Sequence, residues 1–367
     1  MSAEARSPAT GMVPGAPCGE GSSVREPRIA ILIVNWNGKT DTIECLKSLT
    51  ALAYDNVEAI VVDNGSTDDS VEAIRAQFPD VLVVAAGQNL GTSGGRNVGI
   101  RYALERGAEF VLFLDNDTIV DSQLLANLVR EMDRLGGNNI LGAKIYYFDK
   151  PSTIWYAGAS WQGSGFAHIG IGADDHGDAH STAAETDYAC GCALFVSREI
   201  LKQVGLLDDR YFCYFEETDL CYRARAAGFR SFFIPSARVW HKVSSSSGGE
   251  RSPLFYYFMH RNLLLWAEAH LSFRQRLPVY RSIARTVQRA VTPPGFTAGF
   301  ARGSVRAPWI ADFIRNYLRA CKAKYTDPAT VATLMGLRDY VRRRFGDCPD
   351  AVRALRRMSA NQRLQRQ

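Results

Sequence analysis

The sequence predicts an α/β fold with a mainly parallel sheet, because short apolar runs of strand length alternate with segments of helical periodicity. Four such runs lie within the first 120 residues, at 29–34, 57–62, 81–85 and 110–114. Their continuous, β-branched character is typical of buried parallel strands, and each ends in a polar cluster. Successive strand–helix units imply right-handed crossovers, which bring these clusters to the edge where such sheets bind ligands.

The first three strands are each followed by a predicted helix. Apolar residues recur with helical spacing at 41–52, 68–77 and 96–106. Ser66 or Thr67 is expected to cap the second helix. The glycine-rich run at 91–95 is expected to be a loop that allows close backbone approach, with Arg96 at the start of the third helix, where an anion is favoured.

The regular alternation fades after Gly142, where the chain is rich in glycine, serine and aromatic residues up to about residue 186. Later elements are predicted as a strand at 192–196, a helix at 198–204, a strand at 231–240 and a helix at 255–269. A loop is expected at 244–249, and the remainder is expected to be helical, with a break at Pro293 and Pro294. The chain divides into a disordered leader at 1–27, an α/β domain at 28–270 and a helical extension at 271–367.

Charge is divided unevenly along the chain. The whole sequence carries 43 Lys and Arg against 38 Asp and Glu, a net charge of +5. From Leu271 onward, 20 basic and 5 acidic residues give +15, so residues 1–270 carry −10. The basic extension could bind anionic lipid heads or a lipid-linked diphosphate, or could be a solvated helical face. Nucleic acid is not an expected partner, because no recognised binding module accompanies the charge.

Composition bounds the class of protein and its compartment. With 46% hydrophobic and 22% charged residues, the chain is neither disordered nor collagen-like. Its eight cysteines form no CxxC pair, which favours a reducing compartment. The leader lacks the apolar core of a signal peptide, and no run of about 18 apolar residues predicts a membrane span. The sequence therefore predicts a cytoplasmic protein, which the basic extension could hold at the inner face of the cell membrane.

Two carboxylates follow the fourth strand, in the triplet Asp115-Asn116-Asp117. Oxygen ligands suit a hard divalent cation such as Mg²⁺ or Mn²⁺, which keeps other positions for water and substrate phosphates. The triplet could instead form an Asx turn, because Asp and Asn are frequent where strands end. The residues themselves leave both interpretations open.

A second polar cluster, Asp63-Asn-Gly-Ser-Thr-Asp68, follows the second strand. A carboxylate at such a strand end can accept hydrogen bonds from a base or from ribose hydroxyls. The glycine-rich segment at 89–97 is neither GxGxxG nor a Walker sequence, so neither dinucleotide-binding nor P-loop chemistry is indicated.

Several short motifs occur in a fixed order between about residues 28 and 265. The first are Asn35-Trp-Asn37, Asp63-Asn-Gly-Ser66, Asn89-Leu-Gly91, Arg96-Asn97 and Asp115-Asn-Asp117. The later ones are Gly191-Cys-Ala-Leu-Phe-Val-Ser-Arg198, Tyr214-Phe-Glu-Glu-Thr-Asp219, Trp240-His241 and Arg261-Asn262. The series resembles glycosyltransferase family 2, a group with the GT-A fold and nucleotide-sugar donors. It is most similar to the bacterial rhamnosyltransferase-like branch.

The resemblance implies a donor site in the half at 28–120 and an acceptor site in the half at 121–270. Asp63 would contact the nucleotide base, with Asn35 at the edge of the same pocket, and Arg96 would lie near the nucleotide or its diphosphate. The triplet Asp115, Asn116 and Asp117 would hold the donor, its two carboxylates through the metal.

His241 is the implied third metal ligand. An isolated histidine is more often structural than ligating, but this one follows a predicted strand and precedes a Ser/Gly loop, which favours a ligand. In the family, the second acidic residue of the segment 216–219 is the catalytic base. That position is Glu217 here, where Asp is commoner, and Glu216 or Asp219 stay as alternatives. The same acidic residues would also favour a helix N-terminus.

The resemblance thus implies an inverting, metal-dependent glycosyltransferase for cell-surface polysaccharide synthesis, with rhamnose a candidate sugar and a saccharide or lipid-linked saccharide as acceptor. A nucleotidyltransferase is an alternative, although no glycine-rich phosphate signature follows the first strand. A degenerate sugar-nucleotide-binding or scaffolding subunit is another, although the acidic residues and His241 are intact. Trp155, Trp161 and Phe166 could stack on an acceptor sugar or could pack the sheet.

Overall fold

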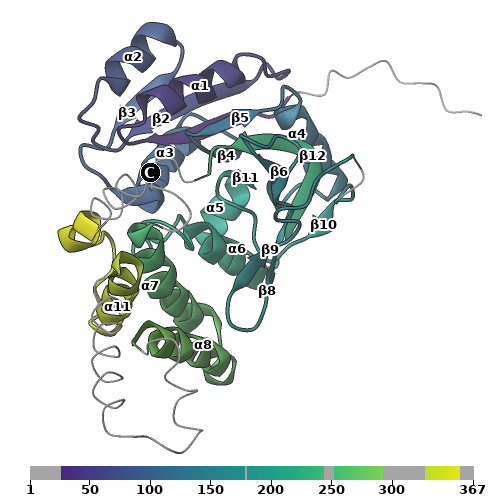
Figure 1. The fold of residues 1–367 in the computed structure, drawn as a ribbon. Helices are drawn as coiled ribbons and strands as arrows, with labels where there is room; N and C mark the ends of the chain where they lie inside the picture. The colour runs from purple at the N-terminus through teal and green to yellow at the C-terminus, as the bar shows by residue number, and fades with distance from the viewer. Residues whose placement is uncertain (1–25, 178–179, 244–251, 292–326, 356–367) are drawn as a thin grey trace, which may run out of the picture.

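The structure, a computed structural model, describes residues 26–177, 180–243, 252–291 and 327–355. Within these ranges it confirms the predicted α/β fold, in which helices cover a central sheet and a helical part follows (Figure 1). Nearly all of the predicted leader lies outside the described residues, as do the loop expected at 244–249 and the break expected at Pro293 and Pro294.

The central sheet is mixed. Its strands are β1 (Ile29–Asn35), β2 (Val57–Asp63), β3 (Leu82–Ala85), β4 (Phe110–Asp115), β5 (Thr118–Val120), β6 (Ile140–Tyr147), β7 (Ile154–Tyr156), β10 (Ala184–Glu185), β11 (Ala193–Ser197) and β12 (Ser231–His241). They lie in the order β10-β12-β6-β11-β4-β1-β2-β3, with β5 on β12 and β7 on β6. A separate hairpin pairs β8 (Ala159–Trp161) with β9 (Phe166–His168).

The N-terminal half of the sheet is parallel, as predicted. β1 pairs in parallel with β2 and β4, and β2 pairs in parallel with β3. The connecting helices are α1 (Lys39–Leu49), α2 (Ser70–Gln77) and α3 (Gly91–Glu105). Right-handed crossovers place α1 and α2 on one face, and α3, which returns the chain from β3 to β4, on the other (Figure 1). The register sets Asn35 opposite Asp63 and Val34 opposite Asp115, so three polar strand ends meet at one edge.

The third helix begins earlier than predicted. α3 starts at Gly91, so the expected loop at 91–95 forms its first turn and Arg96 lies in its second. Gly91 has a φ of 69°, and a Cβ there would lie 2.3 Å from the carbonyl oxygen of Phe212. This glycine is therefore required by a close contact within the protein.

The capping predicted for α2 is wrong. Its N-cap is Asp69, with no side-chain capping bond. The Ser66 hydroxyl instead accepts the backbone N–H of Asn37 at 2.9 Å, and the Thr67 backbone N–H donates to the Asn37 side chain at 2.7 Å. Ser66 and Thr67 therefore tie the end of β2 to the loop after β1.

The second half of the sheet contains a long strand, β6, that the sequence pattern does not predict. Its residues are buried along nearly the whole strand, and such a strand shows no alternation of apolar and polar positions. β11 inserts antiparallel between β4 and β6, and β12 runs parallel to β6. The helices of this half are α4 (Leu124–Arg134), α5 (Arg198–Val204) and α6 (Glu216–Ala226).

The C-terminal part is helical in the residues that the structure describes. Its helices are α7 (Pro253–His270), α8 (Phe273–Val291) and α11 (Pro328–Val341). α11 packs along α7, where the Tyr257 hydroxyl donates to Asp339 at 2.9 Å, and Cys348 and Val352 join the same apolar cluster. Residues 327–355 of the basic extension thus share a core with α7. No described helix combines the length and the apolar character that crossing a membrane requires.

Candidate active site

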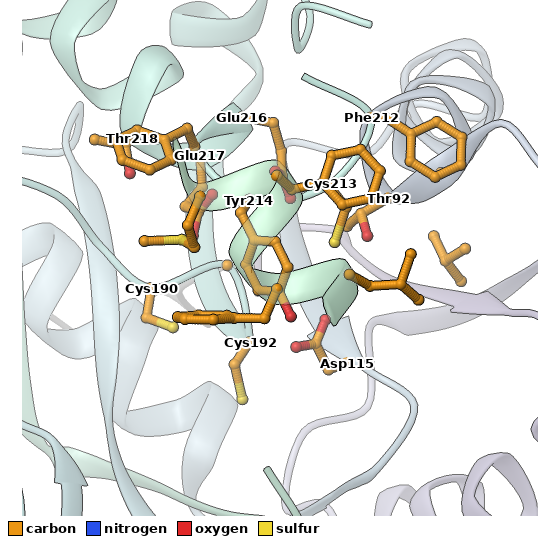
Figure 2. A pocket seen from close by; sticks show the side chains of 18 of the residues that line it. Thr92, Asp115, Cys190, Cys192, Phe212, Cys213, Tyr214, Glu216, Glu217 and Thr218 are labelled. Carbon is orange, nitrogen blue, oxygen red and sulfur yellow. The ribbon is translucent and has the colours of Figure 1, made fainter. Parts of the chain in front are cut away.

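The carboxyl ends of β1 and β4 open into a cavity of about 980 Å³. Its walls come from both halves of the sheet, from the segment at 212–218 and from α7. Figure 2 shows Asp115, Glu216 and Glu217 around this space. The fold therefore brings the predicted metal-binding and catalytic carboxylates to one cavity, although they are far apart in the sequence.

Asp115, Asp117 and His241 lie together at one end of the cavity. The turn after β4 leads into β5, whose antiparallel pairing with β12 sets Thr118 opposite His241. His241 Nε2 lies 3.0 Å from an Asp117 oxygen and 3.9 Å from an Asp115 oxygen. Asp117 and His241 are buried, whereas the Asp115 side chain is 34% exposed. Two carboxylates and an imidazole form a donor set that fits Mg²⁺ or Mn²⁺.

Arg96 connects this end of the cavity to α6. Its buried guanidinium donates to Asp115 at 2.8 Å and to Glu216 at 3.2 Å. It also donates to the Gly191 carbonyl at 2.7 Å, and a Cβ on Gly191 would lie 2.7 Å from the guanidinium. These partners are internal, whereas the resemblance implies a contact with the nucleotide or its diphosphate. In this structure Arg96 holds the end of β4 next to the first turn of α6.

The first turn of α6 carries the candidate base. One carboxylate oxygen of Glu216 and one of Glu217 are buried without a hydrogen-bond partner among the described residues. Burial and the neighbouring Glu217 raise the pKa of Glu216 to about 8, against the opposing charge of Arg96. Burial also raises the pKa of Glu217, again against Arg96. Because Glu216 is bound to Arg96, Glu217 is the better placed of the two to accept a proton.

Asn35 and Asp63 bind each other at the edge of the site. Asn35 Nδ2 donates to Asp63 at 3.2 Å and to Ser70 at 2.9 Å, and its side-chain oxygen accepts from Thr42 at 2.9 Å. Asn116 donates to the same Thr42 hydroxyl at 3.0 Å and lines the cavity. At this edge the cavity wall consists of Val34, Trp36 and Asn64, the sequence neighbours of Asn35 and Asp63. The contact of Asp63 with a nucleotide base stays a prediction.

Asp219 is held away from the cavity wall. Its carboxylate binds Arg223 and His270, each at 2.7 Å. Although burial opposes it, the bonds from His270 and Arg223 lower the pKa of Asp219. Of the three acidic residues in the segment at 216–219, Glu216 and Glu217 line the cavity and Asp219 braces α6 against α7.

A loop with a strained backbone, at 211–215, leads into α6 at the wall of the cavity. Phe212, Tyr214 and Phe215 have φ between 65° and 76°, a left-handed conformation that non-glycine residues rarely adopt. Asn262 Nδ2 donates to the carbonyl oxygens of residues 211, 213 and 214, at 2.8 to 3.0 Å. The fully buried Arg261 donates to the Asn262 side chain at 2.9 Å. This pair in α7 thus holds the loop in its strained conformation.

The sequence pattern assigns no role to Asn262 or to Cys192. The available signal for Asn262 is the polar pair Arg261-Asn262 inside a largely apolar helix. Cys192 lines the cavity because β11 pairs antiparallel with β4, which sets Ala193 opposite Leu114. That pairing has no local sequence signature, since antiparallel insertion in a parallel sheet depends on distant strands.

Aromatic and apolar side chains form the rest of the wall. Of the three aromatic residues considered for the acceptor, Trp155 and Phe166 line the cavity, and Trp161 packs on Trp266 with 4.9 Å between ring centroids. The Trp155 ring also meets His241 edge to face, at 5.1 Å between centroids. α7 contributes an apolar wall made of Leu254, Phe255, Phe258, Met259 and Leu263. The cavity therefore combines charged groups with a large apolar surface.

Known proteins resemble this chain in sequence. Residues 30–205 match the sequence model of the family described as Glycosyl transferase family 2. The chain is 25% identical over 270 residues to the dTDP-rhamnosyl transferase RfbF of Shigella flexneri, covering 71% of this chain and 84% of that protein. It is 28% identical over 236 residues to the N-acetylglucosaminyl-diphospho-decaprenol L-rhamnosyltransferase of Mycobacterium tuberculosis, covering 59% of this chain and 75% of that protein.

Solved structures share the fold at low sequence identity. The mannosyltransferase PcManGT from Pyrobaculum calidifontis, solved with GDP-Man and Mn²⁺, has a TM-score of 0.53 at 15% identity, over 87% of this chain and 88% of that one. GalNAc-T7, solved with UDP, GalNAc and Mn²⁺, has a TM-score of 0.58 at 16% identity, over 73% of this chain and 52% of that one. These likenesses confirm the predicted GT-A fold class.

Proposed function

We propose that this chain moves a sugar from a nucleotide-sugar donor to a saccharide or lipid-linked saccharide, with inversion. The chain carries a glycosyl transferase family 2 domain at residues 30–205 and is a glycosyltransferase. One observation carries the proposal. Asp115, Asp117 and His241 lie at one end of the cavity. Glu217 lies in the wall of the same cavity, with a buried carboxylate oxygen that can accept a proton. Arg96 sets the spacing between these two ends through its bonds to Asp115 and Glu216.

The donor end would bind the diphosphate. Asp115, Asp117 and His241 would hold Mg²⁺ or Mn²⁺, which when bound supplies positive charge against the leaving diphosphate. Asp117 and His241 are buried and therefore restricted to few orientations, whereas the partly exposed Asp115 can reach the donor. Arg96 orients Asp115 from behind, by its 2.8 Å bond to one oxygen.

The acceptor end would supply the base. Glu217 accepts the proton of the acceptor hydroxyl while that oxygen attacks the anomeric carbon, on the face opposite the leaving diphosphate, so the configuration inverts. A base works best when its pKa lies near the operating pH, and burial moves the pKa of Glu217 upward toward that range. The loop at 211–215 and Asn262 would fix the direction from which Glu217 approaches.

The names of the relatives suggest the first substrates to test. The Shigella relative is a dTDP-rhamnosyl transferase and the mycobacterial relative a rhamnosyltransferase acting on a decaprenyl-diphosphate-linked sugar. We therefore propose dTDP-rhamnose as the first donor and a polyprenyl-diphosphate-linked sugar as the first acceptor. The apolar wall from α7 supports such an acceptor, because it could receive the start of a lipid chain.

The basic extension supports a proposed position in the cytoplasm, at the inner face of the cell membrane. α8 exposes Arg274, Arg281 and Arg285. Phe273, at the start of the same helix, is 70% exposed. Basic side chains beside an exposed aromatic ring are attracted to anionic lipid surfaces, which is also where a lipid-linked acceptor would be met.

A substrate screen tests the proposal. The purified chain is incubated with dTDP-, UDP- or GDP-sugars and with a polyprenyl-diphosphate-linked N-acetylglucosamine, with and without Mg²⁺ or Mn²⁺, and the products are analysed by mass spectrometry. We expect metal-dependent sugar transfer with release of a nucleoside diphosphate. In a parallel reaction with a nucleoside triphosphate and a sugar 1-phosphate, release of pyrophosphate would instead identify a nucleotidyltransferase. Tight donor binding with neither transfer nor donor hydrolysis would identify a binding subunit.

A further inference from the structure

The thiol of Cys192 lies beside Asp115 and His241, two of the three residues proposed above as metal ligands. The ligand atoms of Asp115, Cys192 and His241 all lie within 4.8 Å of one another. Cys192 is 2% exposed, and its carbonyl accepts the backbone N–H of Asp115 at 3.0 Å. Figure 2 shows Cys192 and Asp115 next to each other at the edge of the pocket.

The chemistry of a thiolate differs from that of the other two ligands. Mg²⁺ and Mn²⁺ prefer oxygen, whereas Zn²⁺ and Cd²⁺ bind thiolate sulfur strongly and accept imidazole and carboxylate as well. Zinc bonds to sulfur, nitrogen and oxygen of about 2.0–2.3 Å put the ligand atoms of a tetrahedral site about 3.5 Å apart. Atoms that already lie within 4.8 Å need to close by only about 1 Å to reach that geometry.

We propose that Asp115, Cys192 and His241 form a site for a thiophilic divalent cation, Zn²⁺ or Cd²⁺, that competes with the cation needed for sugar transfer. On binding, the Cys192 sulfur forms a bond to the cation and its proton is released to water. The bound cation takes Asp115 and His241 away from the set that would hold Mg²⁺ or Mn²⁺, so it inhibits. The inhibition rests on the proposed function, whereas the binding of the ion does not.

Neighbouring thiols provide matched controls. Cys190 and Cys213 line the same cavity, but among the described residues the cluster within ligand distance contains Cys192 alone of the cysteines. A substitution at Cys190 or Cys213 therefore changes the thiol content of the cavity without changing the proposed ligands.

Zinc X-ray absorption on the wild-type protein tests the site without a variant. With one equivalent of Zn²⁺, we expect one sulfur neighbour at about 2.3 Å together with nitrogen and oxygen neighbours at about 2.0–2.2 Å. The same spectrum is expected from the double variant Cys190→Ser/Cys213→Ser. A shell of nitrogen and oxygen alone in the wild type, or loss of the sulfur in the double variant, would overturn the assignment of Cys192.

A Cd²⁺ titration then compares single variants. The wild type and Cys190→Ser should show the ultraviolet Cd–thiolate band at one equivalent, with release of a proton. Cys192→Ser should lose the band and bind Cd²⁺ at least about 10-fold more weakly. An undiminished band in folded Cys192→Ser would refute the proposal. A protein that binds Cd²⁺ through Cys192 but transfers no sugar would refute the proposed function alone, and normal Mn²⁺-dependent transfer without a sulfur-bound ion would refute this inference alone.

Discussion

Replacement of Glu217 by Gln is the sharpest test of the catalytic assignment. The substitution keeps the size and shape of a buried side chain and removes its ability to take a proton. One Glu217 oxygen is buried without a hydrogen-bond partner among the described residues, so the variant loses no structural hydrogen bond at that oxygen. We therefore expect a folded protein in which chemistry, and not architecture, is impaired.

The expected loss follows from the role of a general base. Such a base contributes about 10²–10⁴-fold to the rate, or roughly 3–5 kcal/mol of transition-state stabilisation. Glu216, the nearest alternative, is bound to Arg96 and is poorly placed to substitute, so the loss should fall in the upper half of that range. The thermal stability of the variant, in contrast to its activity, should not fall. A carboxyl whose pKa is raised on folding loses stabilising free energy as the pH rises through that pKa, so Glu217→Gln should melt no lower than the wild type at pH 8.

The assay is kcat/KM for sugar transfer as a function of pH, with Glu216→Gln as the matched control. In the wild type the rate should rise with pH as Glu217 loses its proton, at a pH above the usual glutamate pKa of 4.5. Glu216→Gln should leave the rising limb near its wild-type pH, because burial and the charge of Asp115, and not Glu216, raise the pKa of Glu217. That variant should keep most of the activity.

Near-normal turnover of folded Glu217→Gln would refute the assignment of the base. A large loss in Glu216→Gln with little loss in Glu217→Gln would transfer the role to Glu216, and its bond to Arg96 would then have to break during the reaction.

Three further predictions concern other parts of the molecule. Asp117→Ala should weaken Mn²⁺ binding in calorimetry by more than about 100-fold, since loss of a residue one shell further out already costs about 10–100-fold; unchanged affinity would place the metal elsewhere. Asn262→Ala removes a donor from the carbonyls of residues 211, 213 and 214, so the unfolding free energy should fall by roughly 1–3 kcal/mol, and kcat should fall more than the KM for donor rises; an unchanged kcat would show that the loop at 211–215 keeps its conformation without Asn262. Arg281→Glu combined with Arg285→Glu should weaken binding to anionic vesicles, measured by sedimentation, by about 1 kcal/mol for each Arg removed, and should leave binding to neutral vesicles unchanged. If the wild type and the variant bind anionic vesicles equally, α8 is a solvated face.

Local patterns were sufficient for the parallel half of the sheet. The strands that became β1, β2, β3 and β4 are short apolar runs, and each carries its polar residues at or just past its end, so the pattern finds both the strand and the cluster. The same reasoning missed β6, which is buried along nearly its whole length and so has no alternation. It also placed the start of α3 too late, because glycine is read locally as a loop former.

The helical extension illustrates a different limit. Its basic composition is visible from the sequence and suggests a separate appendage. In the structure, Gly336 of α11 packs against the backbone of Tyr257 in α7, and the carbonyl of residue 346 accepts a bond from Arg261. The extension therefore takes part in holding the helix that supports the loop at 211–215. Composition shows that the extension is basic, but it does not show which of its residues pack against the rest of the protein.

The sequence by itself determined the fold class, the family resemblance and the identity of the candidate carboxylates, because these depend on residue types at short, regular spacings. Only the tertiary structure decided how they act on one another. Arg96 joins Asp115 to Glu216, Cys192 stands beside Asp115 and His241, and Asn262 holds the approach to Glu217. Each of these contacts is made by strand pairing or helix packing between segments far apart in the chain. Their geometry is set by the register of distant elements, which no local spacing encodes.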